Sequence, residues 1–240
     1  MRVIRSRTRP GLLRVEVIGH ALAFAPRPET RALWDRSIAI GFAIGSACFL
    51  VGPFPGFAQL VGPGADAAVF FAGSIFFTFA AFLEAREGTV RLGRWASDPS
   101  WWSAAVQFLG TLFFNVSTFT AMLDGLSSEQ TNKLVWAPDV FGSACFLVSG
   151  VLAYQVASGG RLRPATRDRD WTMAAINLLG CVLFGVSAVA SFVVPSTGSI
   201  LDLAAANWTT ALGALCFLVG SVMLLAPEDQ DRSQGSAASP

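Results

Sequence analysis

Six long apolar stretches alternate with short polar connections along the 240-residue chain. A helix needs roughly 20 mostly apolar residues to cross the hydrocarbon core of a bilayer, and each stretch has about that length. The expected fold class is therefore all-α, a polytopic membrane protein with six transmembrane helices. The predicted spans are about 36–57, 66–84, 101–123, 135–157, 171–194 and 204–226.

The flanks and loops set the expected domain boundaries. Residues 1–33 mix apolar with charged side chains and are expected to form a cytoplasmic or interfacial segment. Residues 34–226 make up the six-helix transmembrane domain, and the polar tail 227–240 is expected to be disordered. The glycine- and proline-rich stretch 52–64 predicts a short interfacial turn after the first span, with a re-entrant segment as the alternative.

Every apolar stretch contains the same short pattern, a glycine followed directly by a small residue and four residues later by a phenylalanine. The glycines are Gly45, Gly73, Gly110, Gly142, Gly180 and Gly213. The phenylalanines are Phe49, Phe77, Phe114, Phe146, Phe184 and Phe217. Lipid provides little hydrophobic drive between helices, so small residues that let backbones approach closely are a typical packing device. We interpret the pattern as a helix-packing motif; a cofactor groove lined by the aromatic rings is the less favoured alternative.

The pattern also repeats at the level of helix pairs. The third stretch aligns with the fifth without gaps, and the fourth aligns with the sixth. The chain is therefore expected to consist of three tandem helical hairpins, at about 34–88, 101–157 and 171–226, packed with pseudo-threefold symmetry.

These hairpins resemble the YrhK-like family of small bacterial membrane domains, whose pattern is two helices that each contain a Gly-Ser-x-x-Phe core. The core is matched by Gly45-Ser46-Ala47-Cys48-Phe49, Gly73-Ser74-Ile75-Phe76-Phe77 and Gly142-Ser143-Ala144-Cys145-Phe146. The sequence departs from it at Thr111, Cys181 and Ala214, where the serine is replaced. The resemblance implies a bacterial membrane domain and assigns no catalytic residue.

The distribution of basic residues predicts the orientation. Of the 17 basic residues, only Lys133 falls in the three loops that follow the odd-numbered spans; the others are arginines in the N-terminal segment, the tail and the remaining loops. Positive residues favour the cytoplasmic side of short loops. We expect both termini in the cytoplasm and a multi-pass protein of the cell membrane. The near absence of lysine hints at a GC-rich bacterial genome.

Among the polar side chains of the predicted spans, four are candidates for chemistry: Gln107, Asn115, Asp139 and Asn177. Polar groups at membrane depth are costly and are often functional. For the three amides, hydrogen bonding between helices is the favoured interpretation, and a shared polar cavity for a small solute is the alternative. Asp139 follows Pro138, which is ordinary chemistry at the start of a helix. A cation or proton site is the alternative for this carboxylate.

Other chemistries find little support in the sequence. There is one histidine, and no HExxH zinc motif, GxSxG elbow or phosphate-binding loop occurs. The net charge of +1 gives no general attraction to nucleic acid, and no cofactor or metal is expected. We expect a non-enzymatic packed bundle that acts through structural or partner contacts in the bilayer, with a second copy or another membrane protein as partner. The alternative is a transporter or channel for a small neutral or weakly charged solute, which requires the four polar side chains to converge.

Overall fold

The computed structural model describes residues 28–92, 98–160 and 168–226, and this part of the chain is all-helical apart from one short β-hairpin. Its long helices are α2 (Pro28–Val51), α4 (Pro63–Leu92), α5 (Pro99–Thr120), α7 (Ala137–Ala157), α8 (Arg169–Ala190) and α9 (Leu203–Leu225). The all-α prediction is confirmed for these residues. The segment 1–27 and the tail 227–240 lie outside the described residues.

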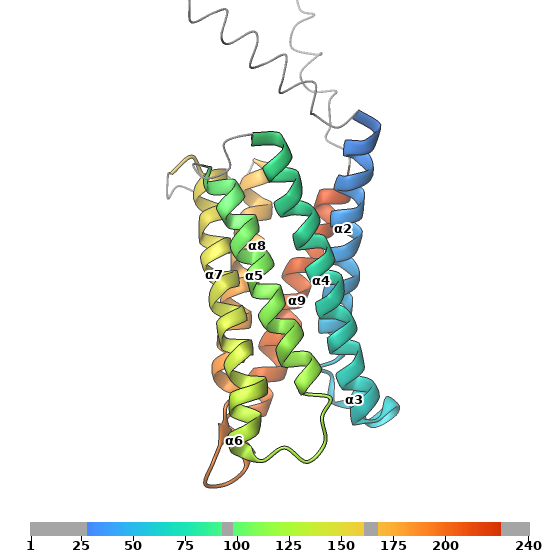
Figure 1. The fold of residues 1–240 in the computed structure, drawn as a ribbon, viewed down its shortest axis with the longest axis vertical. Coiled ribbons are helices and arrows are strands. Elements are labelled where there is room, and N and C mark those ends of the chain that lie inside the picture. The colour runs from blue at the N-terminus through green and yellow to red at the C-terminus, as the bar shows by residue number, and fades with distance from the viewer. Residues whose placement is uncertain (1–27, 93–97, 161–167, 227–240) are drawn as a thin grey trace, which may run out of the picture.

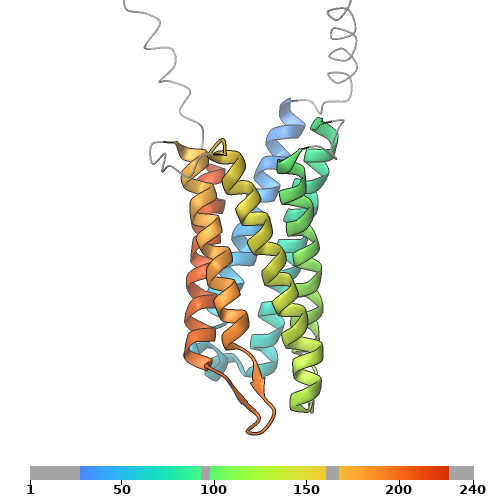
Figure 2. The same cartoon turned by 90° about the vertical axis from the view of Figure 1, so that its left-hand side faces the viewer.

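The long helices stand side by side in a closed ring (Figures 1 and 2). Each helix packs against the next one along the chain, and α9 packs against α2 to close the ring. The start of α2 and the end of α9 lie at one end, which we call the terminal end. The opposite end carries the short helix α3 (Pro55–Val61), and we call it the α3 end.

The outside of the bundle is apolar, unlike the surface of a water-soluble protein, and part of its interior is polar. Large apolar side chains such as Phe79, Phe141 and Val189 are exposed on the outside, whereas Ser46 and Thr111 are fully buried. Among the residues that the structure describes, five helical segments are long and apolar enough to cross a membrane; they correspond to α2, α4, α7 with its preceding turns, α8 and α9. The described bundle is that of a multi-pass membrane protein.

The region after the first span differs from the prediction. The span expected at 36–57 ends at Val51, and the expected interfacial turn contains the separate helix α3. Pro55 begins α3, where its missing N–H group is tolerated. Gly62 then ends α3 with a positive φ of 86°, a conformation that favours glycine. At its other end α2 begins at Pro28, inside the segment 1–33 that was expected to precede the bundle.

The helical backbone around α7 begins earlier than expected. It starts at α6 (Ser128–Thr131), where Ser127 and Gln130 form a capping box, and continues through a π-helical turn, η2 (Asn132–Trp136). In the π turn the Ala137 N–H donates to the Asn132 carbonyl, five residues back. A widened turn just before Pro138 suits a residue that cannot donate a hydrogen bond. Asp139 lies in the first turn of α7 beside Pro138, which is the helix-start position that the sequence predicts. Because α6 and η2 come directly before α7, the helical backbone is continuous from Ser128 to Ala157.

The loop between α8 and α9 contains a β-hairpin that the sequence pattern did not predict. The fifth span was expected to reach residue 194, but α8 ends at Ala190 and is followed by β1 (Val193–Val194) and β2 (Ser199–Ile200). The Asn132 side chain donates to the Val193 carbonyl at 2.7 Å and accepts from the Val193 N–H at 3.0 Å. This pair of bonds attaches the β-hairpin to η2 at the α3 end.

Candidate functional site

The pattern glycines bring the two helices of each antiparallel pair into backbone contact. A Cβ added to Gly45 of α2 would lie 2.9 Å from the Gly73 carbonyl oxygen of α4. A Cβ on Gly110 of α5 would lie 3.0 Å from the Gly142 oxygen of α7. On Gly180 of α8 it would lie 3.1 Å from the Gly213 oxygen of α9. A larger residue at Gly45 or Gly110 requires a shift of the neighbouring helix or side chain, and one at Gly180 requires its neighbours to move by a few tenths of an ångström.

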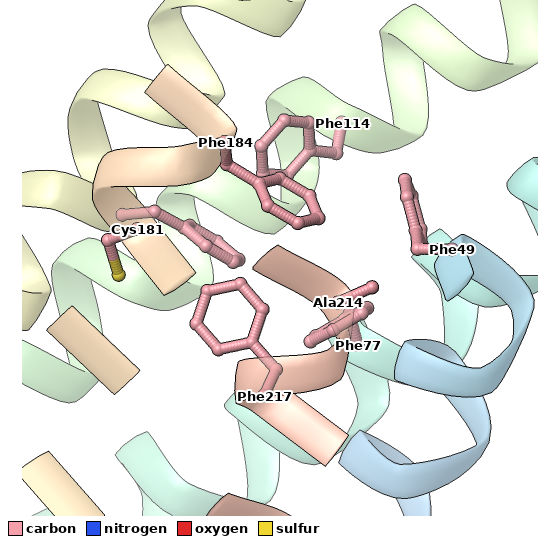
Figure 3. Packing of buried hydrophobic residues seen from close by; sticks show 8 residues of the cluster. Phe49, Phe77, Phe114, Cys181, Phe184, Ala214 and Phe217 are labelled. Atoms are coloured by element: carbon pink, nitrogen blue, oxygen red, sulfur yellow. The ribbon is translucent and has the colours of Figure 1, made fainter. Parts of the chain in front are cut away.

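The pattern phenylalanines fill the centre of the ring and form what we call the aromatic cluster (Figure 3). Its members are Phe49, Phe77, Phe114, Phe146, Phe184 and Phe217. Each ring follows its glycine by four residues, and neighbouring helices run in opposite directions. The rings of α2, α5 and α8 therefore lie toward the α3 end, and those of α4, α7 and α9 lie toward the terminal end.

Ring contacts tie the aromatic cluster together across all three helix pairs. Phe77, Phe146 and Phe217 contact one another with centroid distances of 5.9–6.2 Å. In the other layer the Phe184 centroid lies 5.8 Å from that of Phe49 and 6.0 Å from that of Phe114. Edge-to-face aromatic contacts of this kind add to the energy of burial.

The structure separates the candidate amides from one another. The Ser149 hydroxyl donates to Gln107 Oε1 at 3.1 Å, which joins α5 to α7. Asn177 packs against α9, and a Cβ on Gly220 would meet its Oδ1 at 2.4 Å. Asn115 Oδ1 is buried and has no hydrogen-bond partner among the described residues. The alternative of amides that face one shared cavity is not supported by these placements.

Asp139 lies on the other side of the aromatic cluster from Gln107 and Asn177. It precedes Gly142 on a helix that runs away from the α3 end, whereas the two amides precede the glycines of helices that run toward it. Asp139 lines a cavity of about 410 Å³ at the α3 end, whose wall also includes Phe49 and Phe184 of the aromatic cluster. Of the four candidate side chains, Asp139 is the one that lines this cavity.

A second carboxylate, Asp66 of α4, lines the same cavity, and the sequence reasoning passed over it. Asp66 precedes its pattern glycine, Gly73, by seven residues, and Asp139 precedes Gly142 by three. Residues three or four apart, and seven apart, share a helix face. The number of residues between each carboxylate and its pattern glycine therefore indicates, from the sequence alone, that each carboxylate lies on the glycine face of its helix.

Two smaller pockets lie near the ends of the bundle. A pocket of about 320 Å³ lies between Phe54 and Trp208 and shares Pro53, Leu203 and Asn207 with the cavity. Another of about 320 Å³, at the terminal end, is lined by Glu84, Glu87, Asp98 and other residues of α4 and α5. Within the described ranges no group of three or more histidine, cysteine or acidic residues is placed to hold a metal ion.

Comparison with known proteins does not identify the chain, because it matches no family model, no curated protein and no solved structure. The resemblance to the YrhK-like family stays a prediction.

Proposed function

We propose that the chain is a six-span protein of the bacterial cell membrane, made of three tandem YrhK-like hairpins, α2–α4, α5–α7 and α8–α9. The sixth span is α5, a helix of 22 residues that is not among the five candidate spans and that contains Gln107 and Asn115. Its neighbours support the assignment, since α5 packs between α4 and α7 in the ring. Its outer face carries exposed Leu109, Val116 and Phe119, side chains suited to lipid.

Both termini are assigned to the cytoplasmic side in this proposal. Arg36, Arg86 and Arg169 support it, since they lie at the terminal end of the bundle. The Arg86 guanidinium lies over the Trp34 ring, 4.9 Å from its centroid, and the Arg169 guanidinium donates to the carbonyls of Met223 and Ala226 at the end of α9. Arginine at a cytoplasmic boundary beside tryptophan is typical of membrane proteins.

This topology is tested with reporter fusions placed at the two ends of the bundle. An enzyme that is active only in the cytoplasm is fused after residue 240, and one that is active only after export is fused after Gly125, between α5 and α6. We expect both reporters to be active. The topology is wrong if either fusion is inactive while its opposite reporter at the same position is active.

We further propose that the bundle is non-enzymatic and acts through structural or partner contacts, with the bilayer and either a second copy or another membrane protein as its partners. The observation that supports this function is the aromatic cluster, which fills the centre of the ring where a solute path would run. The sequence also lacks a histidine or lysine at membrane depth that would activate a serine or cysteine nucleophile.

A flux measurement tests this function against the transporter alternative. The purified chain is reconstituted into liposomes and assayed for uptake of monovalent cations, neutral polyols and small amines, with Asp139→Asn and empty liposomes as controls. We expect uptake equal to that of empty liposomes. Uptake by the unmodified chain that Asp139→Asn abolishes would overturn the packed-bundle proposal and establish a transporter.

The cavity at the α3 end is the observation that favours the second candidate, a transporter or channel. It is large enough for a small solute and is lined by two carboxylates. From the sequence, this candidate requires that the four polar side chains Gln107, Asn115, Asp139 and Asn177 converge. The contacts of Gln107 and Asn177 with other helices do not support such convergence.

A further inference from the structure

The cavity at the α3 end is formed by the whole ring. Side chains of α2, α4, α5, α7, α8 and α9 line it, together with residues of α3, η2 and the β-hairpin. Its volume of about 410 Å³ falls within the range of small-molecule pockets, roughly 300–1,000 Å³. A space of this size that every helix helps to shape is suited to one small ligand.

The carboxylates of this cavity have no counter-charge among the residues that line it. No hydrogen bond or ion pair joins the side chain of Asp66 or Asp139 to another described residue, and Asp66 Oδ1 is buried. The single lysine, Lys133, is exposed and pairs with Glu129 at 2.7 Å, and the cavity wall contains no lysine, arginine or histidine. Charges near a low-dielectric environment are costly unless they are paired, so a cation is the complementary ligand.

The rest of the wall distinguishes an organic cation from a metal ion. Calcium and magnesium require six or more oxygen ligands, several of them usually carboxylates, carbonyls or waters at close range. Here most of the wall is apolar, and it includes the rings of Phe49, Phe70, Trp136 and Phe184. Aromatic faces next to carboxylates are the chemistry that recognises ammonium groups bearing carbon substituents.

We propose that the cavity at the α3 end binds a small organic ammonium ion, with Asp66 and Asp139 as its counter-charges and the surrounding aromatic rings as its apolar wall. The site is separate from the function proposed above: a bundle that passes no solute still binds such an ion, and a failed topology assignment leaves the cavity unchanged.

The test is equilibrium binding to the full chain in micelles of an uncharged maltoside detergent, which carries no ammonium group, with choline as the probe. Its neutral isostere, 3,3-dimethyl-1-butanol, has the same shape without the charge. We expect saturable binding of choline and at least tenfold weaker binding of the isostere. This comparison uses the unmodified chain and does not depend on whether a variant folds.

Variants then assign the counter-charges. Asp139→Asn and Asp66→Asn keep the shape of each side chain and should each weaken choline binding about tenfold or more. Asp124→Asn removes the same charge from an exposed position at the same end, outside the cavity wall, and should leave binding within about twofold. Elution of each variant as a monodisperse species confirms that it is folded.

Three results would overturn the inference. The first is equal affinity for choline and its isostere, which shows that the cavity recognises the shape of the ligand and not its charge. The second is a loss of binding in Asp124→Asn as great as in Asp139→Asn, which shows that the cation is attracted by the overall surface charge and not by the cavity. The third is displacement of choline by an equal concentration of sodium, which makes the cavity a site for inorganic cations.

Discussion

The centre of the bundle and its α3 end are built on opposite principles. In the centre, glycine backbones touch and the aromatic cluster fills the remaining space. At the α3 end, a few turns away along the same helices, the ring surrounds an open cavity whose two carboxylates have no side-chain partner among the described residues. The centre thus has the closest contact between helices, whereas the α3 end has less contact and contains two carboxylates without a counter-charge in the cavity wall.

The difference shows where the bundle obtains its stability. Helices in lipid gain little from hydrophobic association, so close packing at the centre has to hold the ring together. With the ring fixed there, the α3 end is free to deviate from regular helix, as it does in α3, in the π turn η2 and in the β-hairpin. Proteins commonly give up local stability where a ligand binds, and this is the pattern expected if the cavity is a binding site.

The largest effect is expected from removing a ring of the aromatic cluster. Phe77 is 4% exposed and contacts the rings of Phe42, Phe49, Phe146 and Phe217. Phe77→Ala should lower the free energy of unfolding by about 3 kcal/mol, the lower end of the range for buried phenylalanine. In lipid the loss of van der Waals contacts still costs energy, whereas the free energy of transferring the ring out of water contributes little. The measurement is SDS-induced unfolding in mixed micelles.

The matched control lies two residues away on the same helix. Phe79 is 52% exposed on the outside of α4, and Phe79→Ala should change the free energy of unfolding by no more than about 0.5 kcal/mol. Equal losses from the two substitutions would mean that the centre of the ring is not where the bundle is held together.

The next largest effect is expected at the backbone contacts. A Cβ on Gly45 would lie 2.7 Å from Phe77 Cδ2 and 2.9 Å from the Gly73 oxygen, so Gly45→Ala should force α2 and α4 apart. Overpacking of this kind costs about 1–3 kcal/mol. The control is Gly185→Ala in α8, where a Cβ meets no atom within 4 Å and alanine should stabilise the helix by about 0.5–1 kcal/mol. Unfolding curves should show that Gly45→Ala lowers the free energy of unfolding and that Gly185→Ala raises it.

A smaller effect is expected from the polar contacts between α5 and α7. Ser149 donates to Gln107 Oε1 and bonds to the Ser103 hydroxyl at 3.1 Å. Ser149→Ala should cost about 0.6 kcal/mol and no more than about 1.7 kcal/mol, the mean and the maximum for hydrogen bonds between membrane helices. Ser158→Ala, which removes only a local bond to the Gln155 carbonyl, should be close to neutral in the same assay. A neutral Ser149→Ala would show that the hydrogen bonds of this hydroxyl contribute nothing to the packing of α5 against α7.

The smallest change in the free energy of unfolding is expected in the cavity, where no loss of stability is predicted. Without ligand, Asp139→Asn should leave the free energy of unfolding unchanged or raise it by up to about 0.5 kcal/mol, because it removes a carboxylate that has no partner among the described residues. A loss greater than 1 kcal/mol would mean that Asp139 stabilises the fold, and the contrast between the two regions would disappear.

Much of the fold is readable from local sequence. Spans at 101–123, 135–157 and 204–226 correspond closely to α5, α7 and α9, because a run of about 20 apolar residues has few alternatives to a helix in a membrane. Helix α4 continues to Leu92, beyond the span expected at 66–84. The errors fall at helix ends: α3, the π turn before Pro138 and the β-hairpin were missed. At these ends the backbone is controlled by prolines, glycine conformation and side-chain bonds such as those of Asn132, which an apolar pattern does not record.

The candidate site divides in the same way. The glycine and phenylalanine positions were found from the sequence because the motif recurs at a fixed spacing in every span. Asp139 was found because a charge inside an apolar run is conspicuous, and Asp66 was missed because it stands at the boundary of its span. That Asp66 and Asp139 line one cavity depends on α4 and α7 facing the same space, which no local signal encodes.

By itself, then, the sequence determined that this chain is helical, that its helices suit a bilayer, and that glycine and phenylalanine recur at one level of each; composition and spacing along the chain are enough for these properties. Only the tertiary structure decided that α9 meets α2 to close a ring, that the aromatic cluster fills its middle, and that the two carboxylates share a cavity. These features arise from contacts between residues far apart in the chain, and such contacts exist only once the helices have packed.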